Sequence, residues 1–165
     1  MGTYDSFFDG FSTRLAQRGF SVRRGIGWRG YSFDLVATTS KYEISKFGKM
    51  TRFIIASAIE SANPRIVEAF SAHATEFALE NRGSLLPRGL GGSLLSIPVA
   101  VSQDFSEEVK GWITQTLAEK HWAAFEFPVL LSTKNGEIFY CARTPMWGWA
   151  YYRGFRNFVE EQIRF

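Results

Sequence analysis

The sequence predicts an α/β fold, a single domain over residues 1–165 in which a central mixed β-sheet is flanked by helices. Three observations lead to this prediction. The length of 165 residues suits one domain with one sizeable core. Several segments carry apolar residues at helical spacing, and short runs rich in strand-forming residues lie between them. One of these runs, FIIASAI, is apolar enough to indicate a strand buried on both faces.

The first half of the chain should begin with a helix at 5–18, because its apolar residues recur at helical spacing and Gly19 is suited to end it. Glycines then separate runs that alternate or are continuously apolar. We expect strands at 20–24, 31–38, 41–47 and 52–59, with a turn at Gly48 and Lys49. A second helix should start at Asn63 and Pro64, which favour the cap and the first helical position, and should end at Gly83.

The second half should continue with a loop at 84–93 and a strand at 94–102, where Pro98 indicates a sheet edge or a bulge. Asp104 and Glu107 resemble a capping box before a third helix that would end near Trp122. A β-hairpin follows at 127–142, since Asn135 and Gly136 suit a two-residue turn. The last helix should start at Tyr151 or Phe155 and end at 163.

Charge and cysteine content limit the classes of function. The net charge is only +3, but residues 1–52 hold nine Lys or Arg against four Asp or Glu, so the basic character is N-terminal. The single cysteine, Cys141, excludes an internal disulfide and indicates a reducing compartment. No apolar run is long enough to cross a membrane. We therefore expect a cytoplasmic protein without a membrane partner.

The segment 19–39 is the first candidate binding site. Arg23, Arg24 and Arg29 could grip phosphates, and Trp28 could offer a stacking ring, as in proteins that bind single-stranded DNA or RNA. The alternative is an ordinary exposed hairpin in which Trp28 folds back onto the sheet.

The second candidate is an interface near the C-terminus. Aromatic residues make up 16% of the chain, more than one core needs, which suggests that some rings lie at a surface. Alternation in the segment MWGWAYY would leave one set of rings outward. The candidates for self-association, or for contact with a protein partner, are Trp147, Trp149, Tyr151 and Tyr152. The alternative is that most of these rings complete the core.

The order helix, three strands, helix, strand resembles the core of the PD-(D/E)xK nuclease superfamily. The opening also resembles its Holliday-junction-resolvase-like members, through Gly19, Phe20, Val22, Arg23, Gly25, Gly27 and the aspartate Asp34 in FDLVA. The resemblance implies a nuclease that uses Mg²⁺, held by Asp34 and a second acid, with a lysine two residues after that acid. If FIIAS forms the strand that should carry the second acid and the lysine, those two positions hold Ile55 and Ser57. Placing KYEISKF there offers Glu43, but Lys46 comes one residue too late and points to the other face unless a bulge intervenes.

Neither placement supplies a complete catalytic set, so the preferred prediction is a non-enzymatic binding or assembly module without a cofactor. Nucleic acid is the first expected partner, and a protein partner or a second copy of the chain is the next. The alternative is a Mg²⁺-dependent nuclease with a degenerate site made of Asp34, Glu43 and Lys46.

Overall fold

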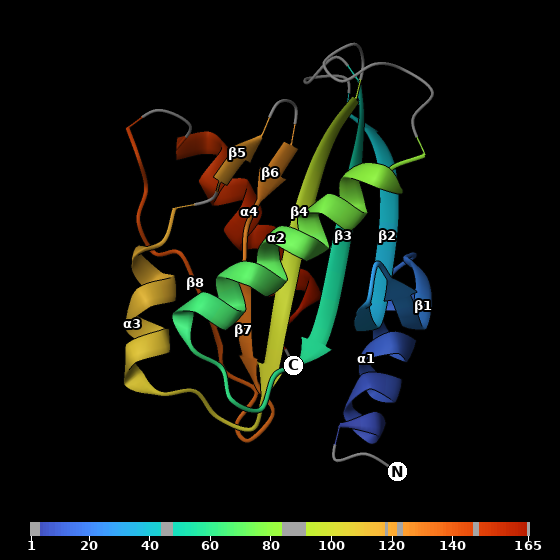
Figure 1. Ribbon diagram of the computed structural model, residues 1–165. Helices are drawn as coiled ribbons and strands as arrows, with labels where there is room; N and C mark the ends of the chain where they lie inside the picture. The colour runs from blue at the N-terminus through green and yellow to red at the C-terminus, as the bar shows by residue number, and fades with distance from the viewer. Residues whose placement is uncertain are drawn as a thin grey trace.

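The computed structural model describes residues 4–43, 48–83, 92–117, 119–121, 124–146 and 149–164 (Figure 1). These residues form four helices and eight strands. In chain order they are α1 (Asp5–Gln17), β1 (Ser21–Trp28), β2 (Tyr31–Glu43), β3 (Gly48–Ala58), α2 (Pro64–Glu80), β4 (Gly92–Ser102), α3 (Glu107–Gln115), β5 (Glu119–His121), β6 (Ala124–Glu126), β7 (Val129–Ser132), β8 (Ile138–Tyr140) and α4 (Trp149–Gln162). The predicted α/β class is confirmed, and the element order holds with β5 and β6 as additions, but the separate strand predicted at 41–47 is wrong. Residues 41–43 belong to β2, and 44–47 lie outside the described residues.

All eight strands of the described chain belong to one mixed sheet. Strands β1, β2 and β3 form an antiparallel meander, and β4 pairs with β3 in parallel. On its other side β4 pairs in parallel first with β6 and then with β7. The sheet therefore branches beyond β4: β5 pairs antiparallel with β6, and β8 pairs antiparallel with β7.

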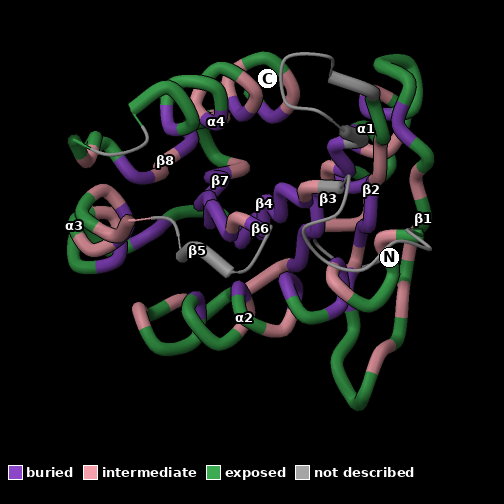
Figure 2. Tube along the Cα trace, turned by 90° about the horizontal axis from the view of Figure 1, so that it is seen from above, coloured by how far each residue is buried: buried purple, intermediate pink, exposed green. Residues whose placement is uncertain are grey.

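Helices cover both faces of the sheet, as Figure 2 shows from above. One face packs against α1 and α4, and its core includes Phe11 and Leu15 of α1 and Tyr152 and Val159 of α4. The other face packs against α2 and α3. None of the helices in the described part of the chain is long and apolar enough to cross a membrane.

Strand β2 is longer than the sequence pattern indicated. It runs without a break to Glu43, and the pairing of Glu43 with Gly48 and of Tyr42 with Lys49 places both Gly48 and Lys49 inside β3. The predicted turn at these two residues is therefore wrong. The middle of β2 is polar, with Thr39, Ser40 and Lys41 in sequence, and so it lacks the apolar alternation that marks a strand.

Helix α2 begins as predicted, because Asn63 Oδ1 accepts a hydrogen bond of 3.0 Å from the Ile66 N–H. Helix α3 begins differently. Ser106 is its N-cap and accepts from the Val109 N–H, whereas Asp104 accepts from the Phe105 N–H at 2.8 Å, so the predicted capping box is wrong. The helix also ends at Gln115 rather than near 122, and the chain instead enters the β5–β6 hairpin that extends the sheet.

Pro98 lies in the sheet interior, opposite Ile55 of β3, so the predicted edge or bulge is wrong. The Ser96 carbonyl accepts a hydrogen bond from the Phe127 N–H, so the backbone groups of Ser96 point towards β6 and β7. Because backbone groups alternate along a strand, Pro98 faces the same side, where β6 has ended and β7 has not begun. A central proline is tolerated here because no neighbour needs its missing N–H.

The predicted hairpin is confirmed as β7 and β8, but its turn is longer than expected. The Ser132 N–H bonds to the Glu137 carbonyl, and the loop spans residues 133–136. Gly136 adopts the positive φ of 71° that the turn requires. Arg29 is the one described non-glycine residue with a positive φ, so Asn135 does not share this conformation and the predicted two-residue turn is wrong.

Candidate functional site

Asp34, the proposed metal ligand, has a structural partner. Its Oδ2 accepts a hydrogen bond of 2.8 Å from the backbone N–H of Ala58, the last residue of β3. Leu35 pairs with Ala56, and one step further in the same register Asp34 lies level with Ser57. This is the serine that stands at the lysine position when FIIAS is taken as the metal-binding strand. The buried Ile55 stands two residues earlier. At this level of the sheet Asp34 has no acidic neighbour on β3.

Glu43 does not approach Asp34. Both residues belong to β2, and nine steps of a strand separate their Cα atoms by roughly 30 Å. Two carboxylates at this separation cannot share one cation. The side chain of Glu43 and all of Lys46 lie outside the described residues. Within the described residues, no group of three or more His, Cys, Asp or Glu side chains could hold a metal ion.

Arg24, one of the residues of the predicted N-terminal site, lies on the sheet face that packs against α1. Its guanidinium pairs with Asp9 at 2.5 Å, lies 5.3 Å from the Phe8 ring centroid and donates to the Asp34 carbonyl at 2.8 Å. These contacts tie β1 to α1.

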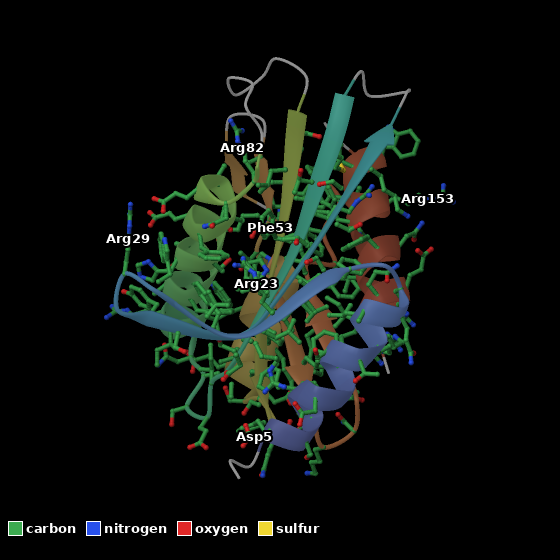
Figure 3. All side chains as sticks on the ribbon, turned by 90° about the vertical axis from the view of Figure 1, so that its right-hand side faces the viewer. Asp5, Arg23, Arg29, Phe53, Arg82 and Arg153 are labelled. Atoms are coloured by element: carbon green, nitrogen blue, oxygen red, sulfur yellow. The ribbon has the colours of Figure 1, made fainter. Side chains whose placement is uncertain are left out.

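Trp28 and Arg29 lie on the α2 face. The Trp28 ring stacks on Phe33, and its Nε1–H donates to Glu80 at 3.0 Å. Arg29 pairs with the same carboxylate at 2.6 Å and covers the Trp28 ring. Figure 3 places Arg29 at the end of the hairpin that is far from α1, with Arg23 near its middle. The structure therefore does not bring these residues together on one surface.

The predicted C-terminal interface divides in two. Tyr152 is only 1% exposed and packs against Phe127 and Phe155 in the core. Trp149 and Tyr151 are 61% and 44% exposed at the start of α4. Trp147 lies outside the described residues.

A groove lies between α4 and the sheet, beside this exposed Tyr151. The cavity, which we call the α4 groove, has a volume of about 380 Å³. The sheet contributes Met50, Arg52 and Leu95, and α4 contributes Ala150, Tyr151, Gly154, Phe155 and Phe158. Apart from Arg52 and the Tyr151 hydroxyl, the groove is apolar and rich in aromatic rings.

A second cavity of about 210 Å³, which we call the basic pocket, adjoins the α4 groove. It shares Arg52 and Phe158 with the groove, and the Arg52 guanidinium lies 5.4 Å from the Phe158 ring centroid. Its other lining residues are Arg18, Phe20, Thr39, Lys41, Glu161 and Gln162. The lining therefore includes three basic residues and one acidic residue.

Strand alternation explains how these cations gather. On β2, Leu35 and Ala37 point into the core beneath α1 and α4, and the same alternation carries Lys41 onto that face. On β3, Ile54 belongs to the same core, and Arg52 stands two residues before it on the same face. In Figure 1 α1 lies at the lower end of the sheet, so it leaves the upper part of this face to α4 and the two cavities.

Arg14 in the last turn of α1 and Arg18 at its C-cap bind the end of α4. Arg18 donates to the Glu161 carbonyl, and Arg14 donates to the Ile163 carbonyl at 3.0 Å. These carbonyls form the negative end of α4, which attracts cations. Burial lowers the pKa of Arg14, and the neighbouring charge of Arg18 lowers it further.

Glu160 at this end of α4 is bound by other groups. Burial raises its pKa, but hydrogen bonds from Arg164 and Tyr140 outweigh this effect and hold the pKa below its usual value.

Comparison with protein-family models, with curated proteins and with solved structures finds no match to this chain. The site must therefore be interpreted from its own residues.

No sequence pattern grouped Arg18, Lys41, Arg52 and Phe158, because they are separated along the chain and meet only after folding. One usable signal was present. Lys41 continues the alternation of Leu35 and Ala37, so a strand extended past residue 38 would have placed it on the core face.

Proposed function

We propose that this protein is a non-enzymatic module that binds nucleic acid on the sheet face covered by α1 and α4. The observation that carries the proposal is the meeting of Arg18, Lys41 and Arg52, from three different elements, at the basic pocket. Guanidinium and ammonium groups are the side chains that bind phosphate oxygens most strongly.

The neighbouring α4 groove supports nucleic acid over a simple inorganic anion. Proteins that bind nucleic acid strands combine a cationic track for the backbone with aromatic rings. Here the track and the rings adjoin, since Arg52 and Phe158 line both cavities. The hairpin offers less, because Arg24 and Arg29 lie on opposite faces of the sheet.

Binding without catalysis is favoured by the surroundings of Asp34. Its carboxylate is engaged by the Ala58 N–H, and Glu43 lies roughly 30 Å along the same strand. An in-line phosphodiester cleavage needs metal ligands that converge on one ion.

The test is fluorescence anisotropy of a labelled oligonucleotide at several salt concentrations. We expect affinity to fall linearly on a logarithmic scale as salt rises, because bound phosphates release counterions. Lys41→Glu should weaken binding and reduce the salt slope. Arg65→Glu is the matched control, since it makes the same charge change at an exposed position on α2. Absence of measurable binding at low salt, or equal loss in both variants, would contradict the proposal.

Self-association is a second candidate function, favoured by the exposed apolar side chains before and within α4. Met146 is 98% exposed and Trp149 is 61% exposed. Exposed apolar side chains that cluster are typical of contact surfaces, and these two lie three residues apart in the chain. Sedimentation velocity should show a mass that rises with concentration and returns to that of the monomer in Trp149→Ser. A wild-type monomer at the highest concentration would exclude this function.

A further inference from the structure

We propose that the nucleic acid is bound as a single strand, with one base in the α4 groove and its phosphate in the basic pocket. This inference rests on the proposed function and specifies the form of nucleic acid that the site accepts.

The two cavities share two lining residues, Arg52 and Phe158. A nucleotide joins a flat ring with apolar faces to a charged phosphate. The α4 groove and the basic pocket offer the complementary pair of surfaces, and they meet at Arg52 and Phe158. A cation stacked beside a ring at this junction can contact the phosphate while the ring contacts the base.

The size and lining of the α4 groove suit a single unpaired base. The groove volume of about 380 Å³ falls in the range of pockets that enclose small ligands. Its lining includes the buried Leu95 and the exposed Tyr151. A base in a duplex is stacked and paired, and so it cannot enter such a groove. A duplex could therefore use only the charges of this site, whereas an unpaired strand could use both cavities.

The α4 groove offers few groups that could distinguish one base from another. Besides the Arg52 guanidinium and the Tyr151 hydroxyl, the described lining of the groove has no polar side chain that could read the edge of a base. Stacking alone is tolerant of sequence, because every base has an aromatic face. We therefore expect binding that distinguishes single strands from duplexes but depends little on base identity.

The experiment compares three labelled ligands of equal length at one salt concentration: a deoxythymidine strand, the same strand with abasic sites, and a duplex. Stacking of one base should make the ordinary strand bind about tenfold or more tightly than the other two. Phe158→Leu and Tyr151→Leu should remove this difference while leaving the salt slope unchanged. Tyr31→Leu is the control, because Tyr31 is a similarly exposed ring on the β1–β2 hairpin.

The outcomes separate this inference from the proposed function. Equal, salt-dependent affinity for all three ligands would overturn the single-strand inference and leave nucleic-acid binding in place. If none of the three ligands binds, both the single-strand inference and the proposed function are overturned. The same holds if the protein binds a long-chain fatty acid but no oligonucleotide. If Phe158→Leu fails to fold, Tyr151→Leu and the abasic strand still decide the question.

Discussion

The carboxylate of Asp34 accepts a hydrogen bond of 2.8 Å from the backbone N–H of Ala58. This bond joins the start of β2 to the last residue of β3, just below the first paired residues, Leu35 and Ala56. It assigns Asp34 a role in holding the sheet together.

Asp34→Ala should therefore destabilise the protein. Loss of the acceptor leaves the Ala58 N–H without its partner and should lower the free energy of unfolding by about 1–3 kcal/mol. Asp34→Asn should cost less, since the amide oxygen can still accept. Urea denaturation measures both changes. If Mg²⁺ raised the melting temperature of the wild type but not of Asp34→Ala, Asp34 would instead be a metal ligand.

Tyr140 should make stability depend on pH in the alkaline range. Burial, assisted by the hydrogen bond to Glu160, raises the pKa of Tyr140 from 10.0 to about 12. The folded state thus favours the neutral phenol, so this contribution is complete below pH 10 and is lost as the pH rises towards 12. Melting temperatures across this range should fall more steeply for the wild type than for Tyr140→Phe. Parallel curves would contradict the assignment.

Cys141 should be unreactive in the folded protein. Its side chain is buried, and burial raises the pKa of the thiol above its usual value. Because the thiolate is the reactive form, alkylation by iodoacetamide at pH 8 should be slow and should accelerate on unfolding. Mass spectrometry gives a clear result, as the chain has one cysteine. Rapid native alkylation would show that the C-terminal half of the fold opens readily.

Ser106 should contribute to stability as the cap of α3. Ser106→Ala removes the acceptor for the Val109 N–H and should cost about 1 kcal/mol. Ser106→Asp retains an acceptor and should restore most of that loss. Thermal melts compare the two variants, and an unchanged melting temperature in Ser106→Ala would show that the cap is dispensable.

Local signals predicted many elements of the fold. Asn63 before Pro64 marks a helix start by its own chemistry, and Gly136 marks a turn because the backbone there needs a positive φ. Elements decided by distant partners were missed. β5 and β6 form because β4 offers an unpaired edge to β6, which no local pattern shows. Pro98 is central because of a gap between two strands formed much later in the chain.

The candidate site was harder to predict for the same reason. The arginines of segment 19–39 are neighbours in sequence, but α1 and α2 draw Arg24 and Arg29 to opposite faces. Lys41 and Arg52 are brought together by the β2–β3 register, in which Thr39 pairs with Arg52. Arg18 and Phe158 join them only when α1 and α4 dock on the same face.

Photo-crosslinking tests the location of the binding site most directly. A single strand that carries 4-thiothymidine is irradiated on the wild-type protein, and mass spectrometry identifies the modified residue. The account predicts crosslinks at Tyr151 or Phe158, which line the α4 groove. Crosslinks confined to Trp28 and the β1–β2 hairpin would contradict it.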